Sequence, residues 1–308
     1  MKVVFIFPGC GSQYVGMVKE LYDTHRIVQE YFEEASNCLS INFVKLCFAS
    51  SDAELARVSQ ATTALFLASC SAAALLIQEG IVPSLLIGFN DGEYGALHTA
   101  SSINFPDGLY LLAKYSVFYE ELLATGDYEA AVIKGLPTQV LEELCLKASE
   151  GEQIVYISIT AGVLDHVVGG HGAAVQRLYN LVGMYSNVSI GSYSVQAGLH
   201  SILMQPVADQ LKVYLEKIDF KNGKIPVISS LDGQLVSQGV EVKKRVMEQI
   251  IRPLEYARLL DILEQYDIVV ELVNGTMLSK LIQQRYPKKF LVTIKRQNDI
   301  EILQELLK

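Results

Sequence analysis

The sequence predicts an α/β protein built around a mainly parallel sheet. Half of its 308 residues are apolar, which is enough to bury a large core. Short β-rich apolar runs alternate with segments of helical spacing, the order that produces parallel strands joined by helices. The strand that begins after Pro83 runs into a glycine-flanked sharp turn and then into a helix. The length fits one large domain with an inserted piece, or two domains.

The first elements follow from the spacing of apolar residues near the N-terminus. The β-rich run Lys2–Phe7 ends at Pro8-Gly9-Cys10-Gly11-Ser12-Gln13, whose glycines and proline favour a loop. This loop lacks the Lys-Ser/Thr ending of a phosphate-binding P-loop. The expected elements are strand Lys2–Phe7, a helix from Val15 to Leu21, a helix over His25–Cys38 and, after the capping box Ser51-Asp52-Ala53-Glu54, a short helix near Leu55–Val58.

The segment Ala61–Ile77 is nearly uncharged and raises the question of a membrane span. It falls short of the ~20 residues that a spanning helix needs, and it is rich in Ala, Ser and Thr. We therefore expect a helix buried in the core, stopped by Gly80, and no membrane association.

The stretch Gly88-Phe89-Asn90-Asp91-Gly92 is the centre of the predicted fold. It keeps the glycine spacing of the G-x-S-x-G nucleophile elbow of α/β-hydrolase-like proteins, whose middle residue sits on a strained turn between a strand and a helix. The middle residue here is Asn90, which has no hydroxyl or thiol that a base could activate. Asn tolerates positive φ better than most residues, so the turn can fold without a nucleophile. The elbow helix is expected to continue towards Ala100.

A change of rhythm from residue 127 predicts a second, smaller unit. A helix over Asp107–Ala124 ends at the turn Thr125-Gly126-Asp127, and the elements after it have the βαββαβ order of a ferredoxin-like fold. They are strand Tyr128–Ile133, helix Pro137–Ala148, strands Ile154–Thr160 and His166–Gly169, helix His171–Gly183 and strand Asn187–Ser192. This order can close on itself. We therefore predict a small subdomain at 127–192, inserted in a large domain formed by 1–126 and 193–308.

The chain then returns to the alternation of the large domain. The expected elements are helix Gln196–Lys217, strand Ile225–Ser229, the turn Asp232-Gly233, helices Val240–Ile251 and Pro253–Tyr266, strand Ile268–Val273 ending at Asn274-Gly275, helix Thr276–Tyr286, strand Phe290–Ile294 and helix Asp299–Leu307.

Charge and cysteine content exclude several function classes. A formal charge of -9 and a pI near 5.1 argue against binding to nucleic acid, which needs clustered Lys and Arg. The five cysteines lie far apart and form no C-x-x-C pair, so neither a disulfide framework nor a zinc site is indicated. Free thiols imply a reducing compartment, and the short apolar run at the N-terminus is too short for a signal peptide. We expect a cytoplasmic protein without a metal or cofactor.

Five motifs, in order across nearly the whole chain, resemble those of malonyl-CoA:acyl carrier protein transacylases and of the acyltransferase components of polyketide synthases. The opening Phe7–Met17 resembles F-P-G-Q-G-S-Q-x-x-G-M, and Gly88–Leu97 resembles the elbow G-H-S-L-G-E-x-x-A-L. Leu199-His200-Ser201 is similar to the F-H-S segment that carries the catalytic histidine. The remaining two are Lys224–Ser230, similar to the strand I-P-V-x-S, and Arg252-Pro253-Leu254, similar to the turn x-P-V after it. The inserted ferredoxin-like subdomain also matches this family.

The resemblance implies roles for individual positions. In the family, a Ser nucleophile gives its proton to a His, an Arg on the helix after the elbow pairs with the malonyl carboxylate, and a loop Gln lines the site. Backbone N–H groups of the opening loop and of the residue after the serine hold the oxyanion. In this sequence the histidine is kept as His200, and Gly11 lies in the opening loop. The other positions differ: Asn90 replaces the serine, Phe89 the histidine before it, Asp91 the leucine after it, Cys10 the loop glutamine, and Tyr115, with Lys114 beside it, the arginine.

These differences disfavour malonyl transfer on three counts. Asn90 cannot form the acyl-enzyme ester, and triad precedent suggests a loss of roughly 10⁴ or more in rate. Neither Lys114 nor Tyr115 reproduces the bidentate geometry of a guanidinium. Asp91 places a negative charge close to the position where an oxyanion forms.

Two replacements for the nucleophile stay open at this point. A Cys10–His200 pair would be a legitimate nucleophile and base, whereas an isolated Cys is commonly a small buried apolar residue. Asp91 with His200 could activate water on a carrier-bound thioester, unless Asp91 points away from the pocket. His200 itself could be satisfied by neighbouring backbone.

Three hypotheses about function follow. The least favoured is a working malonyl transferase with a nucleophile at another position, because the glycine spacing fixes the register of the elbow. Two others remain. The first is a non-catalytic homologue that binds acyl carrier protein or components of a fatty acid or polyketide synthase. The second is an enzyme of altered chemistry, a hydrolase or transferase of acyl-thioesters on acyl carrier protein or CoA, which uses His200 with Cys10 or Asp91. Carrier proteins are acidic, so docking needs a local basic patch. The candidates are Lys243-Lys244-Arg245 and Arg285 with Lys288-Lys289.

Overall fold

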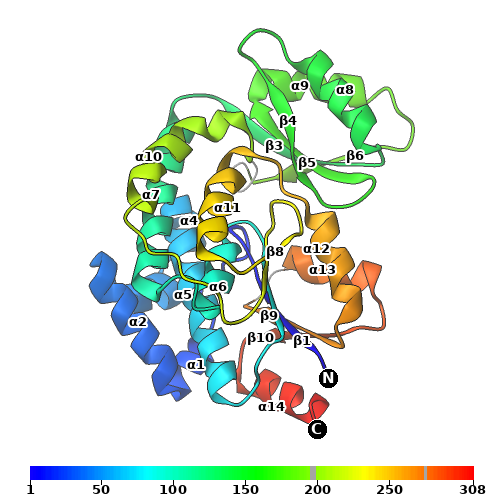
Figure 1. The fold of residues 1–308 in the computed structure, drawn as a ribbon. Helices are drawn as coiled ribbons and strands as arrows, with labels where there is room; N and C mark the ends of the chain where they lie inside the picture. The colour runs from blue at the N-terminus through cyan, green and yellow to red at the C-terminus, as the bar shows by residue number, and fades with distance from the viewer. Residues whose placement is uncertain (195–198, 274–275) are drawn as a thin grey trace.

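The computed structural model describes residues 1–194, 199–273 and 276–308, and its strands form two separate sheets (Figure 1). The larger sheet has the order β10-β9-β1-β2-β7-β8, in which all neighbours are parallel except β7 and β8. Its strands are β1 (Val3–Phe7), β2 (Leu85–Gly88), β7 (Val227–Ile228), β8 (Leu235–Val236), β9 (Ile268–Leu272) and β10 (Phe290–Ile294). The predicted α/β class with a mainly parallel sheet is confirmed.

β1 is the central strand, and all five of its residues are buried because both faces of the sheet are covered. Val3, Phe5 and Phe7 face one hydrophobic core, while Val4 and Ile6 face a second. The first core is packed by α1 (Lys19–Thr24), α2 (Arg26–Leu39), α3 (Phe43–Ala49), α5 (Val58–Gln78), α6 (Gly92–Thr99), α7 (Phe105–Ala124), α10 (Gln205–Leu215), α11 (Gly239–Ile251) and α14 (Gln297–Leu306). The second is packed by α12 (Tyr256–Ile262), α13 (Thr276–Arg285) and the smaller sheet.

Helix α5 is long and apolar enough to cross a membrane by length and composition. In the fold, 83% of its apolar window is buried inside the protein. It packs against α2 and α7 in the first core, so the prediction of a core helix in this stretch is confirmed.

The elbow is formed by β2, a tight turn and α6, and it packs directly on the end of β1. Asn90 occupies the tip with φ +56, the left-handed conformation that its residue type tolerates. A Cβ on Gly88 would lie 2.1 Å from the Cα of Glu93, and one on Gly92 would lie 2.3 Å from the carbonyl oxygen of Phe7. Both glycines are therefore required by close backbone approach, as the elbow motif predicts.

The smaller sheet is antiparallel, with the order β4-β5-β3-β6, and carries two helices on one face. Its elements are β3 (Tyr128–Lys134), α8 (Thr138–Ala148), β4 (Val155–Thr160), β5 (Asp165–His171), α9 (Gly172–Val182) and β6 (Ser189–Tyr193), the βαββαβ order expected for this region. Its edge strand β4 is joined to the large unit by hydrogen bonds from Leu254 N to Ser158 O (2.9 Å) and from Thr160 N to Leu254 O (2.8 Å). The division into domains 1–126 plus 193–308 and 127–192 stays a prediction.

Several element boundaries differ from the prediction. The helix expected from Gln196 begins only at Gln205, because Pro206 has no N–H and fits the first turn of α10. Residues 199–201 are not helical. Residues 195–198 and the predicted turn at 274–275 lie outside the described residues. The first helix starts at Lys19, after Val18 in a left-handed conformation. The capping serine is Ser51, whose Oγ accepts from Glu54 N at 3.1 Å, so α4 (Asp52–Leu55) lies earlier than predicted.

Two elements were not predicted at all. Helix α3 is capped by Asn42, whose side chain accepts from Lys45 N at 2.8 Å, so the signal was present in the sequence. Strand β8 is only two residues long and exists through its pairing with β7, which local spacing does not reveal.

Replacing Gly88 by Ala should strongly destabilise the protein, because the added methyl group would collide with the backbone of α6. We expect Gly88→Ala to lower the free energy of unfolding by about 3 kcal/mol, measured by urea titration. The matched control is Gly191→Ala on the exposed strand β6, where the nearest atom lies 3.8 Å from the new Cβ. The control should change stability by about 0.5 kcal/mol or less, and equal effects of the two substitutions would contradict this account.

Candidate active site

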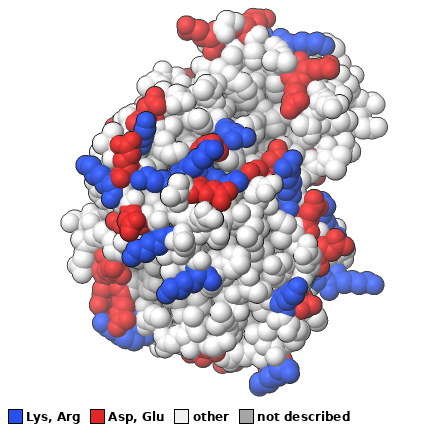
Figure 2. Space-filling model, viewed as in Figure 1, with Lys and Arg blue, Asp and Glu red and all other residues white. Residues whose placement is uncertain are grey.

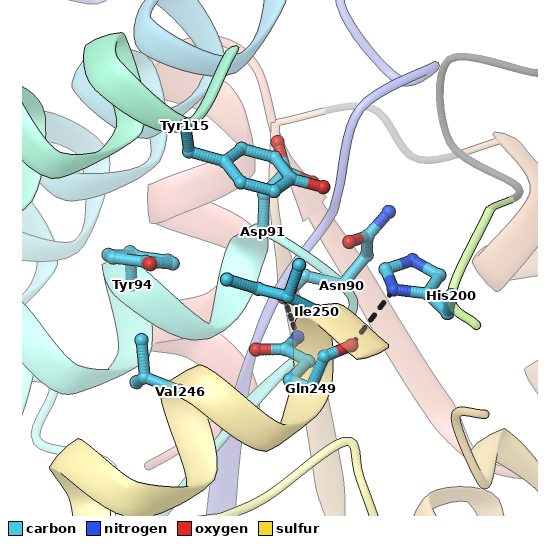
Figure 3. Close-up of a pocket in the computed structure, with 8 residues that line it drawn as sticks. All are labelled: Asn90, Asp91, Tyr94, Tyr115, His200, Val246, Gln249 and Ile250. Atoms are coloured by element: carbon cyan, nitrogen blue, oxygen red, sulfur yellow. Dashed lines mark hydrogen bonds between the residues drawn. The ribbon is translucent and has the colours of Figure 1, made fainter. Parts of the chain in front are cut away.

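The elbow tip lies in a small pocket at the carboxyl ends of β1 and β2 (Figure 3). The residues that line it come from the elbow and α6, from α7, from the segment before α10 and from α11; they are Asn90, Asp91, Tyr94, Tyr115, His200, Val246, Gln249 and Ile250. The cavity they enclose is about 10 Å³, the room that a single water molecule needs. Little free space is therefore left beside the elbow tip.

Asn90 presents its carboxamide beside the imidazole of His200 (Figure 3). The residue is 7% exposed, and its backbone carbonyl accepts a hydrogen bond from Gln249 Nε2 at 2.7 Å. The side chain at the elbow tip therefore lies next to the one basic ring of the pocket.

His200 is held as a neutral acceptor towards position 90. It is 3% exposed, and its Nδ1 donates to the backbone carbonyl of Gln249 at 3.1 Å. Because a carbonyl only accepts, Nδ1 carries the proton and Nε2 is left with its lone pair. Burial lowers the pKa of His200 to about 4, opposed by the bond to the Gln249 carbonyl, so the ring is neutral at pH 7.

A buried polar network ties α11 to the elbow. The carboxylate of Glu93, which is 2% exposed, accepts from the N–H of Ser230 at 2.9 Å and from its Oγ at 2.7 Å. Gln249 Nε2 also donates to Ser230 Oγ at 2.9 Å. The network fixes the end of α11, and with it the carbonyl that orients His200.

Glu93 and Gln249 were not among the site residues predicted from the sequence. Glu93 matches the Glu of the elbow motif, so that motif contained the signal. Gln249 is one of many polar residues on a predicted helix, and its position beside the elbow depends on tertiary packing alone.

Asp91 turns its carboxylate towards the opening loop. Its Oδ1 accepts from the backbone N–H of Cys10 at 2.7 Å, although the residue is only 7% exposed. Burial raises the pKa of Asp91 to about 7, against the hydrogen bonds from the backbone of Cys10 and from its own backbone, which lower it. A Cβ on Gly9 would lie 2.8 Å from this Oδ1, so Gly9 leaves the space that the carboxylate occupies.

The opening loop contributes a backbone group of Cys10 rather than its thiol. Burial raises the pKa of the Cys10 thiol far above its usual range, and the charge of Asp91 raises it further, so the thiol is neutral. Cys10 is not among the residues that line the pocket. Gly11 is exposed, and its N–H donates to Gln13 Oε1 at 2.8 Å instead of facing the elbow.

Three aromatic or basic positions named from the sequence have different surroundings. Tyr115 is 7% exposed and lines the pocket with its ring. The neighbouring Lys114 lies outside the pocket, with Nζ above the rings of Tyr110 (5.3 Å) and Tyr214 (5.4 Å). Phe89 packs in the second core, edge to face with Tyr256 at 4.7 Å between ring centroids.

The structure thus brings together four of the eight predicted site residues, namely Asn90, Asp91, Tyr115 and His200, and adds the backbone N–H of Cys10. Phe89, Lys114 and Gly11 do not line this pocket. Among the residues that the structure describes, there is no group of three or more His, Cys, Asp or Glu side chains arranged to hold a metal ion.

Comparison with known proteins identifies the family and the fold of this chain. The family model of the acyl transferase domain matches residues 4–295. The malonyl CoA-acyl carrier protein transacylase of Bacillus subtilis (strain 168) is 28% identical over 309 residues, covering 100% of this chain and 98% of the relative. That of Escherichia coli (strain K12) is 30% identical over 258 residues, covering 83% of each chain.

Solved structures of the same kind superpose over nearly the whole chain. The malonyl CoA-acyl carrier protein transacylase of Coxiella burnetii has a TM-score of 0.93 at 25% identity, covering 99% of this chain and 97% of the other. A malonyl-transacylase solved in complex with a type II polyketide synthase acyl-carrier protein has the same fold, with a TM-score of 0.93 at 24% identity over 99% of this chain and 100% of the other.

The neutral state of His200 predicts a pH dependence of stability. The unfolded chain protonates this histidine below pH 6.5, whereas the folded chain resists protonation until about pH 4, so stability is complete above 6.5 and is lost as the pH falls from 6.5 to 4. Between pH 7 and pH 4, wild-type protein should lose on the order of 3 kcal/mol more than His200→Gln, which keeps a donor for the Gln249 carbonyl. Urea unfolding at both pH values measures the difference. Equal losses, or a His200 ring that titrates near 6.5 by NMR, would contradict the prediction.

Proposed function

The chain belongs to the acyl transferase domain family, and we propose that it is a non-catalytic member that binds acyl carrier protein, or a synthase component, in fatty acid or polyketide biosynthesis. The observation that supports this most strongly is the carboxamide of Asn90 at the elbow tip, beside a neutral His200. We place its action in the cytoplasm, where its free cysteines stay reduced.

The chemistry of an amide explains why transfer fails at this tip. Acyl transfer through an elbow needs an oxygen or sulfur nucleophile that loses its proton to the base, attacks the thioester carbonyl and expels the thiol. The carboxamide nitrogen of Asn90 has its lone pair delocalised into the carbonyl, so a neutral imidazole cannot turn it into a nucleophile. His200 keeps its orientation. Residue 90, however, has no hydroxyl or thiol that would become a nucleophile when the ring removes its proton.

The surroundings of the tip are also unsuited to a malonyl group. The malonyl carboxylate would meet the neutral ring of Tyr115 instead of a guanidinium, and the carboxylate of Asp91 lines the same pocket. A cavity of about 10 Å³ has no room for a three-carbon acyl chain unless side chains move.

Binding of a carrier protein is supported by the kind of relative and by the surface beside the pocket. The relatives named above are transacylases of acyl carrier protein, and one structural neighbour was solved in complex with such a carrier. Figure 2 shows basic side chains over α10 and α11, interspersed with acidic ones. Because Gln249 and Ile250 of α11 line the pocket, this helix carries both charged surface residues and part of the candidate site.

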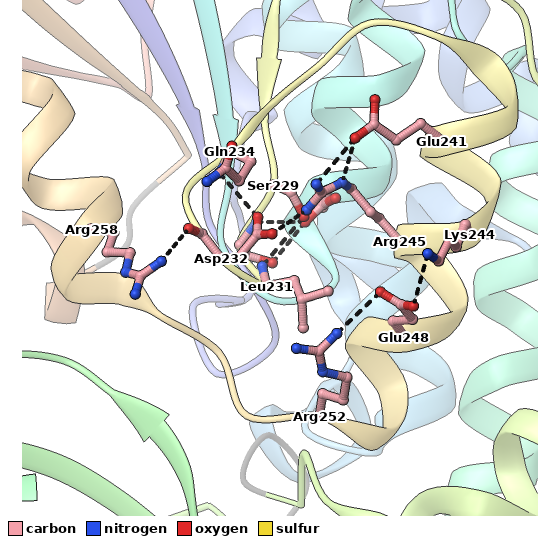
Figure 4. Close-up of polar contacts among 12 residues, drawn as sticks. Ser229, Leu231, Asp232, Gln234, Glu241, Lys244, Arg245, Glu248, Arg252 and Arg258 are labelled. Carbon is pink, nitrogen blue, oxygen red and sulfur yellow. Dashed lines mark hydrogen bonds and ion pairs between the residues drawn. The ribbon is translucent and has the colours of Figure 1, made fainter.

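Within the basic cluster 243–245, the charge of Arg245 is balanced by neighbouring carboxylates (Figure 4). Arg245 pairs with Asp232 and Glu241, and Lys243 donates to backbone carbonyls of residues 216 and 218. The exposed cations of α11 and its end are Lys244 and Arg252, with side chains 72% and 56% exposed, and both share the carboxylate of Glu248. Two cations on one carboxylate leave a net positive charge, so we propose that Lys244 and Arg252 contact an acidic carrier protein.

An altered hydrolytic chemistry is the second candidate, and one observation favours it. Asp91 lines the same pocket as His200, and its pKa of about 7 is suited to a general base. Its Oδ1 is already bound to the Cys10 N–H, which reduces its freedom to activate water. The Cys10 version is less supported because its thiol is buried and neutral.

The proposal predicts that the wild-type protein stays unmodified by acyl donors. After incubation with malonyl-CoA or acetyl-CoA, with and without holo acyl carrier protein, intact-mass spectrometry should show no acyl adduct, and thiol release should equal the rate without protein. A catalytic relative such as the Escherichia coli transacylase serves as positive control. An acyl adduct on the wild-type protein would overturn the proposal of a non-catalytic member. Thioester loss that disappears in Asp91→Asn or Cys10→Ala would overturn it as well, in favour of an acyl-thioester hydrolase or transferase.

Carrier binding should depend on the charge at the end of α11. We expect Arg252→Glu to weaken binding of acyl carrier protein by about tenfold at low ionic strength, with a smaller effect at high salt, measured by fluorescence anisotropy. Lys288→Glu, in the second basic cluster on the loop before β10, makes the same charge change and should leave binding within about twofold. Equal weakening by both variants would argue against this docking surface, and no measurable binding by wild-type protein would argue against the proposed function.

A further inference from the structure

The carboxylate of Asp91 interacts with two backbone N–H groups beside residue 90. The Cys10 N–H donates to Oδ1 at 2.7 Å, and the N–H of Asp91 itself also lowers the pKa of this carboxyl by hydrogen bonding. In a nucleophile elbow, the N–H of the residue after the tip and an N–H from a neighbouring loop form the oxyanion hole. Here these two positions are Asp91 and Cys10.

We propose that the Asp91 carboxylate is a built-in occupant of this pair of N–H groups, and that it closes the site to acyl-thioesters independently of the residue at position 90. The inference rests on the proposed function, because it gives a second and separate cause for the absence of acyl transfer. It concerns occupation of a binding site rather than loss of a nucleophile.

A carboxylate oxygen has the properties of the group that these donors are placed to receive. It is an anionic oxygen, and a length of 2.7 Å is typical of a charge-assisted hydrogen bond. The carbonyl oxygen of a thioester would need the same two donors, and would meet a negative charge of like sign as its own charge develops. The thioester oxygen can bind these donors only if the Asp91 carboxylate moves away from them.

The surrounding fold holds the carboxylate in this position. Gly9 provides the space, because a Cβ there would lie 2.8 Å from Oδ1 and 2.4 Å from the carbonyl oxygen of Phe89. Five titratable groups interact with the charge of Asp91, namely the Cys10 thiol and the phenols of Tyr94, Tyr115, Tyr193 and Tyr256. Burial raises the pKa of each, so all five are neutral at pH 7 and none offers a positive charge that would attract the carboxylate to another position.

The test restores a serine nucleophile at position 90 and then varies the side chain at position 91. Three variants are compared, Asn90→Ser, Asn90→Ser with Asp91→Leu, and Asn90→Ser with Asp91→Asn, using acetyl-CoA as an uncharged acyl donor. In the reaction followed, the serine Oγ forms the ester bond, the carbon–sulfur bond breaks, and the serine proton passes through His200 to the departing CoA thiolate. The rate of acetyl-enzyme formation is measured by intact mass.

Occupation predicts a specific order of rates. The single variant should acylate slowly, and Asp91→Leu should raise the rate by about 10²-fold or more, the usual worth of an oxyanion-hole donor. Asp91→Asn keeps an oxygen on the Cys10 N–H, so its rate should stay within about tenfold of the single variant. Equal rates in the single variant and the Leu double variant, or a rate with Asn as high as with Leu, would overturn the proposal.

A second measurement does not depend on acylation or on the stability of the variants. In wild-type protein, the amide proton resonances of Cys10 and Asp91 should titrate together, with a midpoint well above the ordinary range of an Asp carboxyl, because both report the same carboxylate. Failure of the two resonances to titrate would also overturn the proposal. Acylation of the wild-type protein would instead contradict the proposed function, so the two failures are distinguishable.

Discussion

Close backbone approach at the elbow is the constraint on which the site depends. β2 and α6 can lie against the end of β1 only because Gly88 and Gly92 have no Cβ, and the tip between them must take a left-handed conformation. This geometry is independent of catalysis. An Asn fits the tip as well as any residue other than Gly, so the turn, the sheet and the surrounding helices are compatible with a side chain that cannot carry an acyl group.

The polar network around the tip depends on the same geometry. Glu93 on α6 binds Ser230, Ser230 binds Gln249, and the carbonyl of Gln249 orients His200. Each of these groups is almost fully buried, so removal of one partner would leave another unsatisfied in a medium of low dielectric. The orientation of His200 is thus supported by interactions that hold the fold together, which gives a physical reason for an ordered imidazole beside the amide of Asn90.

The pocket at the tip is lined by one acidic side chain and by aromatic rings that are neutral at pH 7. The pocket contains a carboxyl at Asp91, the phenols of Tyr94 and Tyr115 and a neutral imidazole, with no guanidinium among its lining residues. A site of this kind has little attraction for an anionic acyl group, and its volume is close to that of one water molecule. The surface beside it keeps two exposed cations on α11 and its end, so a role in recognition of an acidic partner is compatible with the whole arrangement.

The sequence by itself determined the class of fold, the elbow and the identity of its tip, because these depend on local features: period of apolar residues, glycine spacing and the residue type at position 90. It also placed His200 and Asp91 near the tip through the order of the motifs. Tertiary structure alone decided which neighbours share the pocket. Lys114 and Tyr115 are adjacent in sequence, yet successive helical residues point about 100° apart, so only Tyr115 faces the tip. Gln249, and the turn of the Asp91 carboxylate towards the Cys10 N–H, depend on contacts between segments 81 to 159 residues apart, which no local pattern encodes.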